Sequence, residues 1–167
     1  MKIFIAGPRA IFHLSKAVED RLYGIYEKGY TVLVGDANGV DKAIQKYFAG
    51  QGYANVIVYA SNGKARNNLG NWQVEAVPVP ENTKGFAFYA MKDKAMADAA
   101  EYGFMLWNGE SKGTLNNIIN LLNDSKKALV YFSPDESFIN IDSPDALETL
   151  LMRCPEETMN LYKKLSL

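Results

Sequence analysis

The stretch "LWNGESKGTLNNI", residues 106–118, decides the fold class of this chain. Its apolar start ends at Trp107, glycines follow at Gly109 and Gly113, and a helical pattern begins at Thr114. An apolar run that passes through a glycine-rich loop into a helix is typical of a strand-to-helix connection. Free backbone N–H groups and the helix dipole favour an anion at such a first turn. We therefore predict a phosphate-binding loop here.

The same succession of apolar runs and helical patterns extends over most of the chain. The run "YTVLVG" is continuous and apolar, as in a parallel strand that is buried on both faces. Apolar residues recur at helical spacing between Ser15, a candidate cap, and Gly29, a candidate stop. The expected strands are 2–6, 30–35, 55–60, 74–79, 102–107 and 127–132, and the expected helices are 15–28, 40–49, 86–100 and 114–124. This alternation predicts an α/β, Rossmann-like, doubly wound and mostly parallel sheet.

Two segments depart from the alternation. Residues 61–73 form a polar loop rich in Asn, Gly and cations, and Pro78 makes the strand after it short or an edge strand. After residue 132 a polar connection leads to short C-terminal helices near 144–151 and 155–165. We expect a Rossmann-type domain over 1–132 and a helical tail over 133–167, which packs on that domain or mediates pairing with another chain.

The composition excludes several classes of protein. The formal net charge is -1, which argues against a broad nucleic-acid surface. The chain has 1 cysteine and 1 histidine, so neither a disulfide framework nor a cysteine-rich metal cluster is expected. No apolar segment approaches the roughly 20 residues of a membrane helix. We expect a soluble, cytoplasmic protein that uses no metal and no cofactor.

Three loops at expected strand ends carry chemistry that suits a ligand. They are "GPRA" (7–10), "GDANGVD" (35–41) and "GESKGT" (109–114). Glycines let a ligand approach the backbone, Arg9 suits a phosphate, and the aspartates of the second loop accept hydrogen bonds or cap a helix. Trp107 either stacks on a base or packs in the core. The predicted ligand-binding residues are Gly7, Arg9, Gly35, Asp36, Gly39, Asp41, Trp107, Gly109, Ser111, Lys112, Gly113 and Thr114.

Three motifs are "IAGPR", "GDANGVDKAI" and "MKDKAMADAAEYGFMLWNGESKGT". Together they resemble the SLOG superfamily of Rossmann-like proteins, and the resemblance covers about residues 1–132. The superfamily includes the DNA-processing protein DprA and the LOG phosphoribohydrolases. The pattern is similar to that of small YpsA-like or LOG-like members from bacteria or phages. The resemblance implies a nucleotide-binding fold and, since these proteins often pair, a homodimer.

The sequence departs from the LOG pattern at the residues on which LOG chemistry depends. Lys94 stands where LOG has an arginine, and Asn117 stands where LOG has a glutamate. An amide cannot act as a general base or stabilise a cationic sugar as a carboxylate does. We therefore carry over the fold and the phosphate loop, without the hydrolase activity. Glu110, Asp41 and Lys94 remain the weak catalytic candidates.

Three functions stay open at this stage. The leading one is the binding of a nucleotide or a nucleotide-derived small molecule, as a sensor or regulator. The alternative is an enzyme that cleaves or transfers the N-glycosidic bond of a nucleotide, with Asp36, Asp41, Asp98 or Glu110 as the carboxylate. The third is DprA-like binding of single-stranded DNA, for which the loop with Lys64, Arg66 and Trp72 offers cations and an aromatic ring. Because of the near-neutral charge, a nucleic acid is not the partner we expect.

Overall fold

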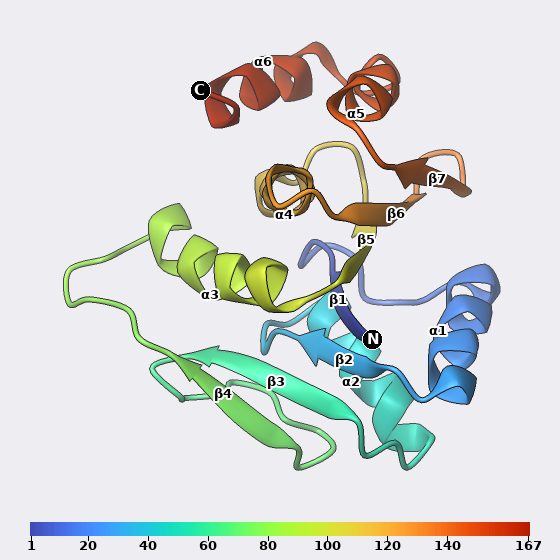
Figure 1. Cartoon of the computed structure of the whole chain (residues 1–167), viewed down its shortest axis with the longest axis vertical. Helices are drawn as coiled ribbons and strands as arrows, with labels where there is room; N and C mark the ends of the chain where they lie inside the picture. The colour runs from blue at the N-terminus through green and yellow to red at the C-terminus, as the bar shows by residue number, and fades with distance from the viewer.

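The chain folds around one sheet of seven strands in the order β4-β3-β2-β1-β5-β6-β7 (Figure 1). The computed structural model describes residues 1–167. All neighbouring strands are parallel except the antiparallel pair of β6 and β7. The strands are β1 (Lys2–Ala6), β2 (Thr31–Val34), β3 (Val56–Ser61), β4 (Gln73–Val77), β5 (Tyr102–Trp107), β6 (Lys127–Phe132) and β7 (Ser137–Ile141). The strand order reverses at β1, between β2 and β5, where a doubly wound sheet places its ligands.

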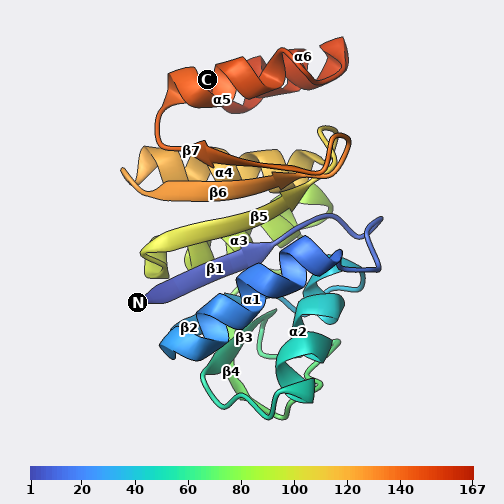
Figure 2. The ribbon, with the colours of Figure 1, turned by 90° about the vertical axis from the view of Figure 1, so that its right-hand side faces the viewer.

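Helices cover both faces of this sheet (Figure 2). The pair α1 and α2 lies on one face and the pair α3 and α4 on the other, while α5 and α6 lie beyond β7. The helices are α1 (Lys16–Lys28), α2 (Val40–Gly50), α3 (Phe86–Ala99), α4 (Lys112–Asn123), α5 (Pro144–Leu151) and α6 (Glu156–Leu165). The predicted Rossmann-like α/β fold is therefore confirmed.

Side-chain caps and glycines set the ends of the helices. The hydroxyl of Ser15 accepts a hydrogen bond from the backbone N–H of Val18, and Gly29 ends α1 in the left-handed conformation at φ 70°. Both features are as predicted. Helix α4 begins two residues earlier than expected, because Ser111 caps it by accepting from the N–H of Thr114.

One strand was not predicted. Residues 133–136 turn the chain back, and Ser137–Ile141 then pairs antiparallel with β6. The signal for this strand is weak, because "SFINI" is short and lies between two polar stretches. The predicted boundary after residue 132 thus falls between two strands of the same sheet, and the division into a domain and a tail stays a prediction.

The hydrophobic core lies on both faces of the sheet. The cluster on the α3 and α4 side includes Trp107, Phe132 and Leu115, and buried leucines of α5 join it. The cluster on the α1 and α2 side includes Phe48, Ile44 and Val34. No helix in the chain has both the length and the hydropathy that crossing a membrane requires.

Candidate functional site

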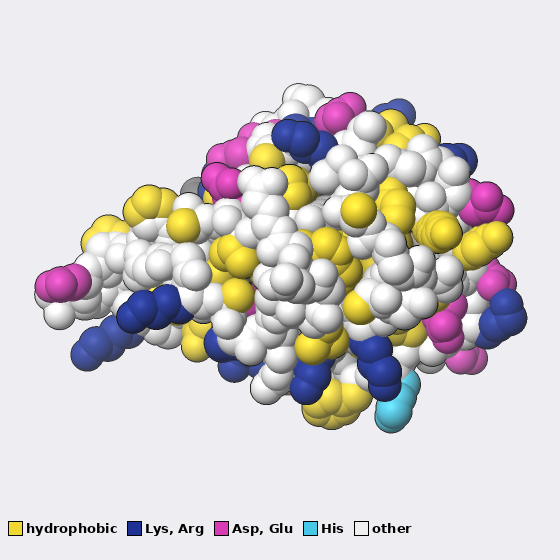
Figure 3. Space-filling model, turned by 90° about the horizontal axis from the view of Figure 1, so that it is seen from below, with side chains coloured by type: hydrophobic (Ala, Val, Ile, Leu, Met, Phe, Trp, Pro, Cys, Tyr) yellow, Lys and Arg dark blue, Asp and Glu magenta, His cyan; other side chains and the backbone are white.

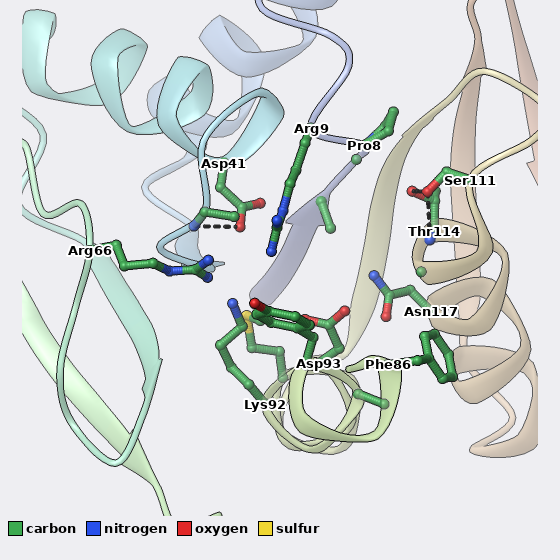
Figure 4. Close-up of a pocket in the computed structure, with 17 residues that line it drawn as sticks. Pro8, Arg9, Asp41, Arg66, Phe86, Lys92, Asp93, Ser111, Thr114 and Asn117 are labelled. Carbon is green, nitrogen blue, oxygen red and sulfur yellow. Dashed lines mark hydrogen bonds between the residues drawn. The ribbon is translucent and has the colours of Figure 1, made fainter. Parts of the chain in front are cut away.

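A cleft of about 300 Å³ opens at the carboxyl ends of β1, β2 and β5. The loops after these strands form its sides, and α3 forms its floor (Figure 4). The cleft is lined by Ala6, Gly7, Pro8, Arg9, Ala37, Asp41, Arg66, Phe86, Tyr89, Ala90, Lys92, Asp93, Met96, Ser111, Gly113, Thr114 and Asn117. We call the side with Asp36, Asp41, Arg66 and Lys92 the α2 wall. We call the side with Ser111, Lys112, Gly113, Thr114 and Asn117 the α4 wall.

The α2 wall is built around the buried carboxylate of Asp36. Its Oδ1 accepts hydrogen bonds from Arg66 Nη2 at 2.9 Å and from Lys92 Nζ at 3.0 Å. Its Oδ2 accepts from the backbone N–H of Arg66 at 2.9 Å. Burial alone would raise the pKa of Asp36, but the hydrogen bonds from Arg66 and the charge of Lys92 hold that pKa well below its usual range. These contacts fix the polar loop with Arg66 against the end of β2.

Asp41 lies next to this ion cluster, in the first turn of α2. Its Oδ2 accepts a hydrogen bond from the backbone N–H of Ala37 at 3.2 Å. Gly35 makes room for it, since a Cβ there would lie 2.4 Å from Asp41 Oδ2 and 3.1 Å from Lys92 Nζ. Burial raises the pKa of Asp41 to about 7, although the nearby Lys92 charge lowers it. Asp41 is therefore a carboxyl group that titrates near neutral pH, within the cleft.

A second carboxyl group with a raised pKa stands on the floor of the cleft. Burial raises the pKa of Asp93 to about 6, against the lowering effects of the Lys92 charge and of the Asn117 amide. Asn117 is 3% exposed, and its Oδ1 has no hydrogen-bond partner. A buried acceptor without a partner costs free energy, which a donor group of a ligand would recover.

The α4 wall offers donors at a helix N-terminus. The N–H groups of Thr114 and Leu115 already donate to Ser111, whereas those of Lys112 and Gly113 have no partner within the chain. The Thr114 hydroxyl donates to Ser111 Oγ at 3.1 Å. A Cβ at Gly113 would meet nothing within 4 Å, so this position faces open space. Of the backbone donors expected at this helix start, two adjacent N–H groups are therefore free to bind an anion, and two hydroxyls lie beside them.

An aromatic ring stands at the mouth of the cleft between two cations. The guanidinium carbon of Arg9 lies 4.8 Å from the centroid of the Tyr89 ring, and that of Arg66 lies 5.5 Å from it. A hydrogen bond and the positive charge of Arg9 lower the pKa of Tyr89. A second hollow of about 240 Å³ continues past Tyr89 and is lined by Asp36, Ser61, Asn62, Lys64, Arg66, Phe88 and Tyr89.

The structure brings half of the predicted ligand residues into the cleft. These are Gly7, Arg9, Asp41, Ser111, Gly113 and Thr114. Asp36 belongs to the α2 wall without lining the cleft itself, and Gly35 lies directly behind Asp41. Lys112 places its Nζ 4.0 Å from the Phe86 ring centroid. Gly39 makes room for the loop after β1, since a Cβ there would lie 2.4 Å from Arg9 Cα.

Two predicted ligand residues are structural instead. Trp107 is fully buried, and its Nε1 donates to the carbonyl of Ser111 at 3.1 Å, so it packs in the core and offers no face to a base. Gly109 does not line the cleft. It turns the chain at φ 81°, and its carbonyl accepts a hydrogen bond from the buried Thr158 hydroxyl of α6 at 2.6 Å.

Of the three catalytic candidates, the structure places only Asp41 in the cleft. Glu110 is exposed and does not line it. Lys94 points away from the cleft and pairs with Asp98 on the surface of α3. Lys92 reaches the cleft and Lys94 does not, because residues two positions apart face different sides of a helix.

Sequence reasoning missed the cleft residues on α3. Phe86, Tyr89 and Asp93 are spaced by three and four residues, which places them on one face of a helix. That spacing was visible in the sequence. What was not visible is that this face meets the ends of β1 and β5, since that depends on the packing of α3 beside α4.

Comparison with known proteins finds a structural relative. No family model matches the chain, and no curated protein matches it. The structure is similar to that of DNA processing protein A (DprA) from Helicobacter pylori, a protein that binds single-stranded DNA. The TM-score is 0.62 and the sequence identity 12%, over 99% of this chain and 80% of that chain. The likeness shows a shared Rossmann-like fold, and the LOG-like or YpsA-like assignment stays a prediction.

The relative corrects one prediction. Nucleic acids had been set aside as partners, yet a protein of this fold binds single-stranded DNA. Net charge does not exclude such a partner, because it averages over the whole surface, whereas binding depends on where the cations lie. Figure 3 shows Lys and Arg side chains along the lower margin of the molecule, beside its one histidine, with the acidic side chains mainly elsewhere.

Proposed function

We propose that the chain binds single-stranded nucleic acid at the carboxyl edge of its sheet. One nucleotide occupies the cleft and its neighbour occupies the hollow beyond Tyr89. The observation that carries this proposal is the continuity of the two cavities, which share Arg66 and Tyr89. Binding of single strands needs cations that follow the backbone and aromatic rings on which bases stack. Arg9, Arg66 and Lys64 are suitable cations here, and Tyr89 is a suitable ring.

The α4 wall supplies the position of a phosphate in this proposal. The unpartnered N–H groups of Lys112 and Gly113 lie in the same turn as the Ser111 and Thr114 hydroxyls, at the positive end of the α4 dipole. Arg9 approaches from the loop after β1, on the other side of the cleft. The DNA binding of the structural relative supports the same class of partner.

Fluorescence anisotropy with a labelled oligothymidylate of about 16 nucleotides tests the proposal. We expect binding that weakens steeply with salt, and a salt slope that falls by about one unit in Arg9→Ala, because one phosphate contact is lost. Arg21→Ala is the matched control. Arg21 lies over the Phe138 ring, away from the cleft, and its removal should leave the affinity unchanged.

Two results would refute single-strand binding. One is the absence of saturable binding at low salt. The other is an equal loss of affinity in Arg9→Ala and Arg21→Ala, which would indicate attraction by general charge without a defined groove.

A second candidate function is the binding of a free nucleotide, as a sensor or as an N-glycosidic enzyme. The unpartnered Asn117 Oδ1 favours it, because a sugar hydroxyl would satisfy this buried acceptor. Asp41 and Asp93 are carboxyl groups with raised pKa values, as general acids often are. Incubation with nucleoside monophosphates and chromatography for free base would detect turnover. Turnover that is lost in Asp93→Asn would favour the enzyme, and a thermal shift without turnover would favour the sensor.

A further inference from the structure

An apolar hollow lies at the opposite edge of the sheet from the cleft. It has a volume of about 320 Å³ and opens beside α1 at the amino ends of β1, β5 and β6. Ile3, Phe104 and Leu129 line it from the strands, and Ile25 lines it from α1. No helix lies over β5 and β6 on this face of the sheet (Figure 2). We call this cavity the amino-end hollow.

Gly24 lines the amino-end hollow from the interior of α1. A glycine inside a helix is less favourable than an alanine, because it loses more backbone entropy on folding. Nothing within the chain requires a glycine here, since its φ is not positive and a Cβ would meet no atom within 4 Å. The missing side chain leaves the backbone of α1 open to the hollow. An isolated helical glycine usually has a packing or functional reason, and here the open space points to a ligand.

The charged groups around the amino-end hollow favour an anion. Arg21 and Lys28 lie about one helical turn on either side of Gly24, and both are exposed. Neither forms an ion pair within the chain, and each lies over an aromatic ring instead. The one carboxylate among the lining residues is that of Asp20, which pairs with Lys16 at 2.6 Å. Two cations at the rim are therefore free to meet a negative group.

We propose that the amino-end hollow binds a small organic anion with an apolar body. The apolar body fills the space between α1 and the strands, in front of Gly24, and the acid group meets Arg21 or Lys28 at the rim. A cavity of this size with a mainly apolar lining and a few polar groups is typical of small-molecule sites. The site lies at the amino ends of the strands, so it goes beyond nucleic-acid binding in the cleft and does not depend on it.

Fluorescence titration of the full chain with anilinonaphthalene sulfonate, an apolar aromatic anion, tests the proposal. We expect saturable binding to the folded protein. Gly24→Leu should lower the affinity at least about tenfold, because the new side chain fills the hollow, without lowering the melting temperature. Gly50→Leu is the matched control, since a Cβ at this glycine of α2 also meets nothing within 4 Å and lies outside the hollow. Absence of saturable binding, or equal affinities of Gly24→Leu and wild type, would overturn the proposal.

A neutral probe tests the role of charge. Phenylnaphthylamine has the same rings without the sulfonate. Lys28→Glu should weaken the binding of anilinonaphthalene sulfonate and leave that of phenylnaphthylamine unchanged, because only the anion meets the charge at the rim. Lys46→Glu changes an exposed charge on α2 and is the control. An equal effect of Lys28→Glu on both probes would overturn the preference for an anion.

Competition with nucleic acid separates the two sites. Saturating oligothymidylate should displace neither probe, because the cleft lies at the carboxyl ends of the strands and the amino-end hollow at their amino ends. Displacement of anilinonaphthalene sulfonate by the oligonucleotide would place this probe in the cleft and overturn the proposal.

Discussion

The two walls of the cleft use polar groups in opposite ways. On the α2 wall, Asp36 accepts hydrogen bonds from Arg66 and Lys92, so both cations pair with the same buried carboxylate. On the α4 wall, two backbone N–H groups and Asn117 Oδ1 have no partner in the chain. Buried polar groups normally have hydrogen-bond partners. We therefore expect the α2 wall to stabilise the fold and the α4 wall to bind a ligand. Substitutions in the α2 wall should therefore change stability, and substitutions in the α4 wall should change binding.

Lys92→Met should have the largest effect on stability. It leaves the buried carboxylates of the α2 wall without their shared cation, and the loss of one partner of a buried ion pair costs about 3 to 5 kcal/mol. Lys94→Met, two residues further on the same helix, breaks an exposed pair and should cost less than about 1 kcal/mol. Urea denaturation measures both. Similar losses of unfolding free energy in the two variants would show that the α2 wall does not stabilise the fold.

Asp41→Asn should change how stability depends on pH. The pKa of Asp41 is raised in the folded chain to about 7, so folded Asp41 keeps its proton between pH 4 and 7 while the unfolded chain releases it. Wild-type stability therefore falls as pH rises through this window. Asp41→Asn lacks this loss. Above pH 7 its free energy of unfolding should gain up to about 4 kcal/mol over that of wild type, at about 1.36 kcal/mol per pKa unit.

Thermal unfolding from pH 4 to pH 8 measures this gain, with the exposed Asp142→Asn as control. A constant difference between Asp41→Asn and wild type across this range would contradict a raised pKa of Asp41 in the folded chain.

The same substitution at two glycines compares the walls directly. Gly35→Ala places a methyl group 2.4 Å from Asp41 Oδ2 and should destabilise the chain by about 1 to 3 kcal/mol. Gly113→Ala points into open space and should change stability by less than about 1 kcal/mol, in either direction. Denaturation midpoints measure both. A larger loss at Gly113 than at Gly35 would reverse the assignment of the walls.

Much of the fold follows from the sequence, because caps, glycines and apolar runs act locally. Ser15, Gly29 and the apolar run of β2 predicted their elements almost to the residue. The strand β7 was missed, since its pairing with β6 depends on a turn formed by a polar segment. The sequence does not decide whether Trp107 stacks on a base or packs in the core. The burial of a side chain at a strand end depends on how the helices pack around it.

The site was predicted only where a motif carried it. The glycine loops gave Arg9, Asp41 and the start of α4, all of which lie in the cleft. Lys92 and Asp93 lie within the quoted motif at 91–114, but that motif pointed to Lys94, and the role of Lys92 depends on its long-range pair with Asp36. Such pairs join residues far apart in the chain, which local spacing does not reveal.

The most direct test of the central claim is a titration of wild type and Gly113→Val with the same labelled oligothymidylate. The β-branched side chain would occupy the space in front of the free N–H groups on the α4 wall, where the claim places a phosphate. We expect an affinity at least about tenfold weaker for Gly113→Val, with a melting temperature within a few degrees of wild type. Equal affinities for the two proteins would contradict it.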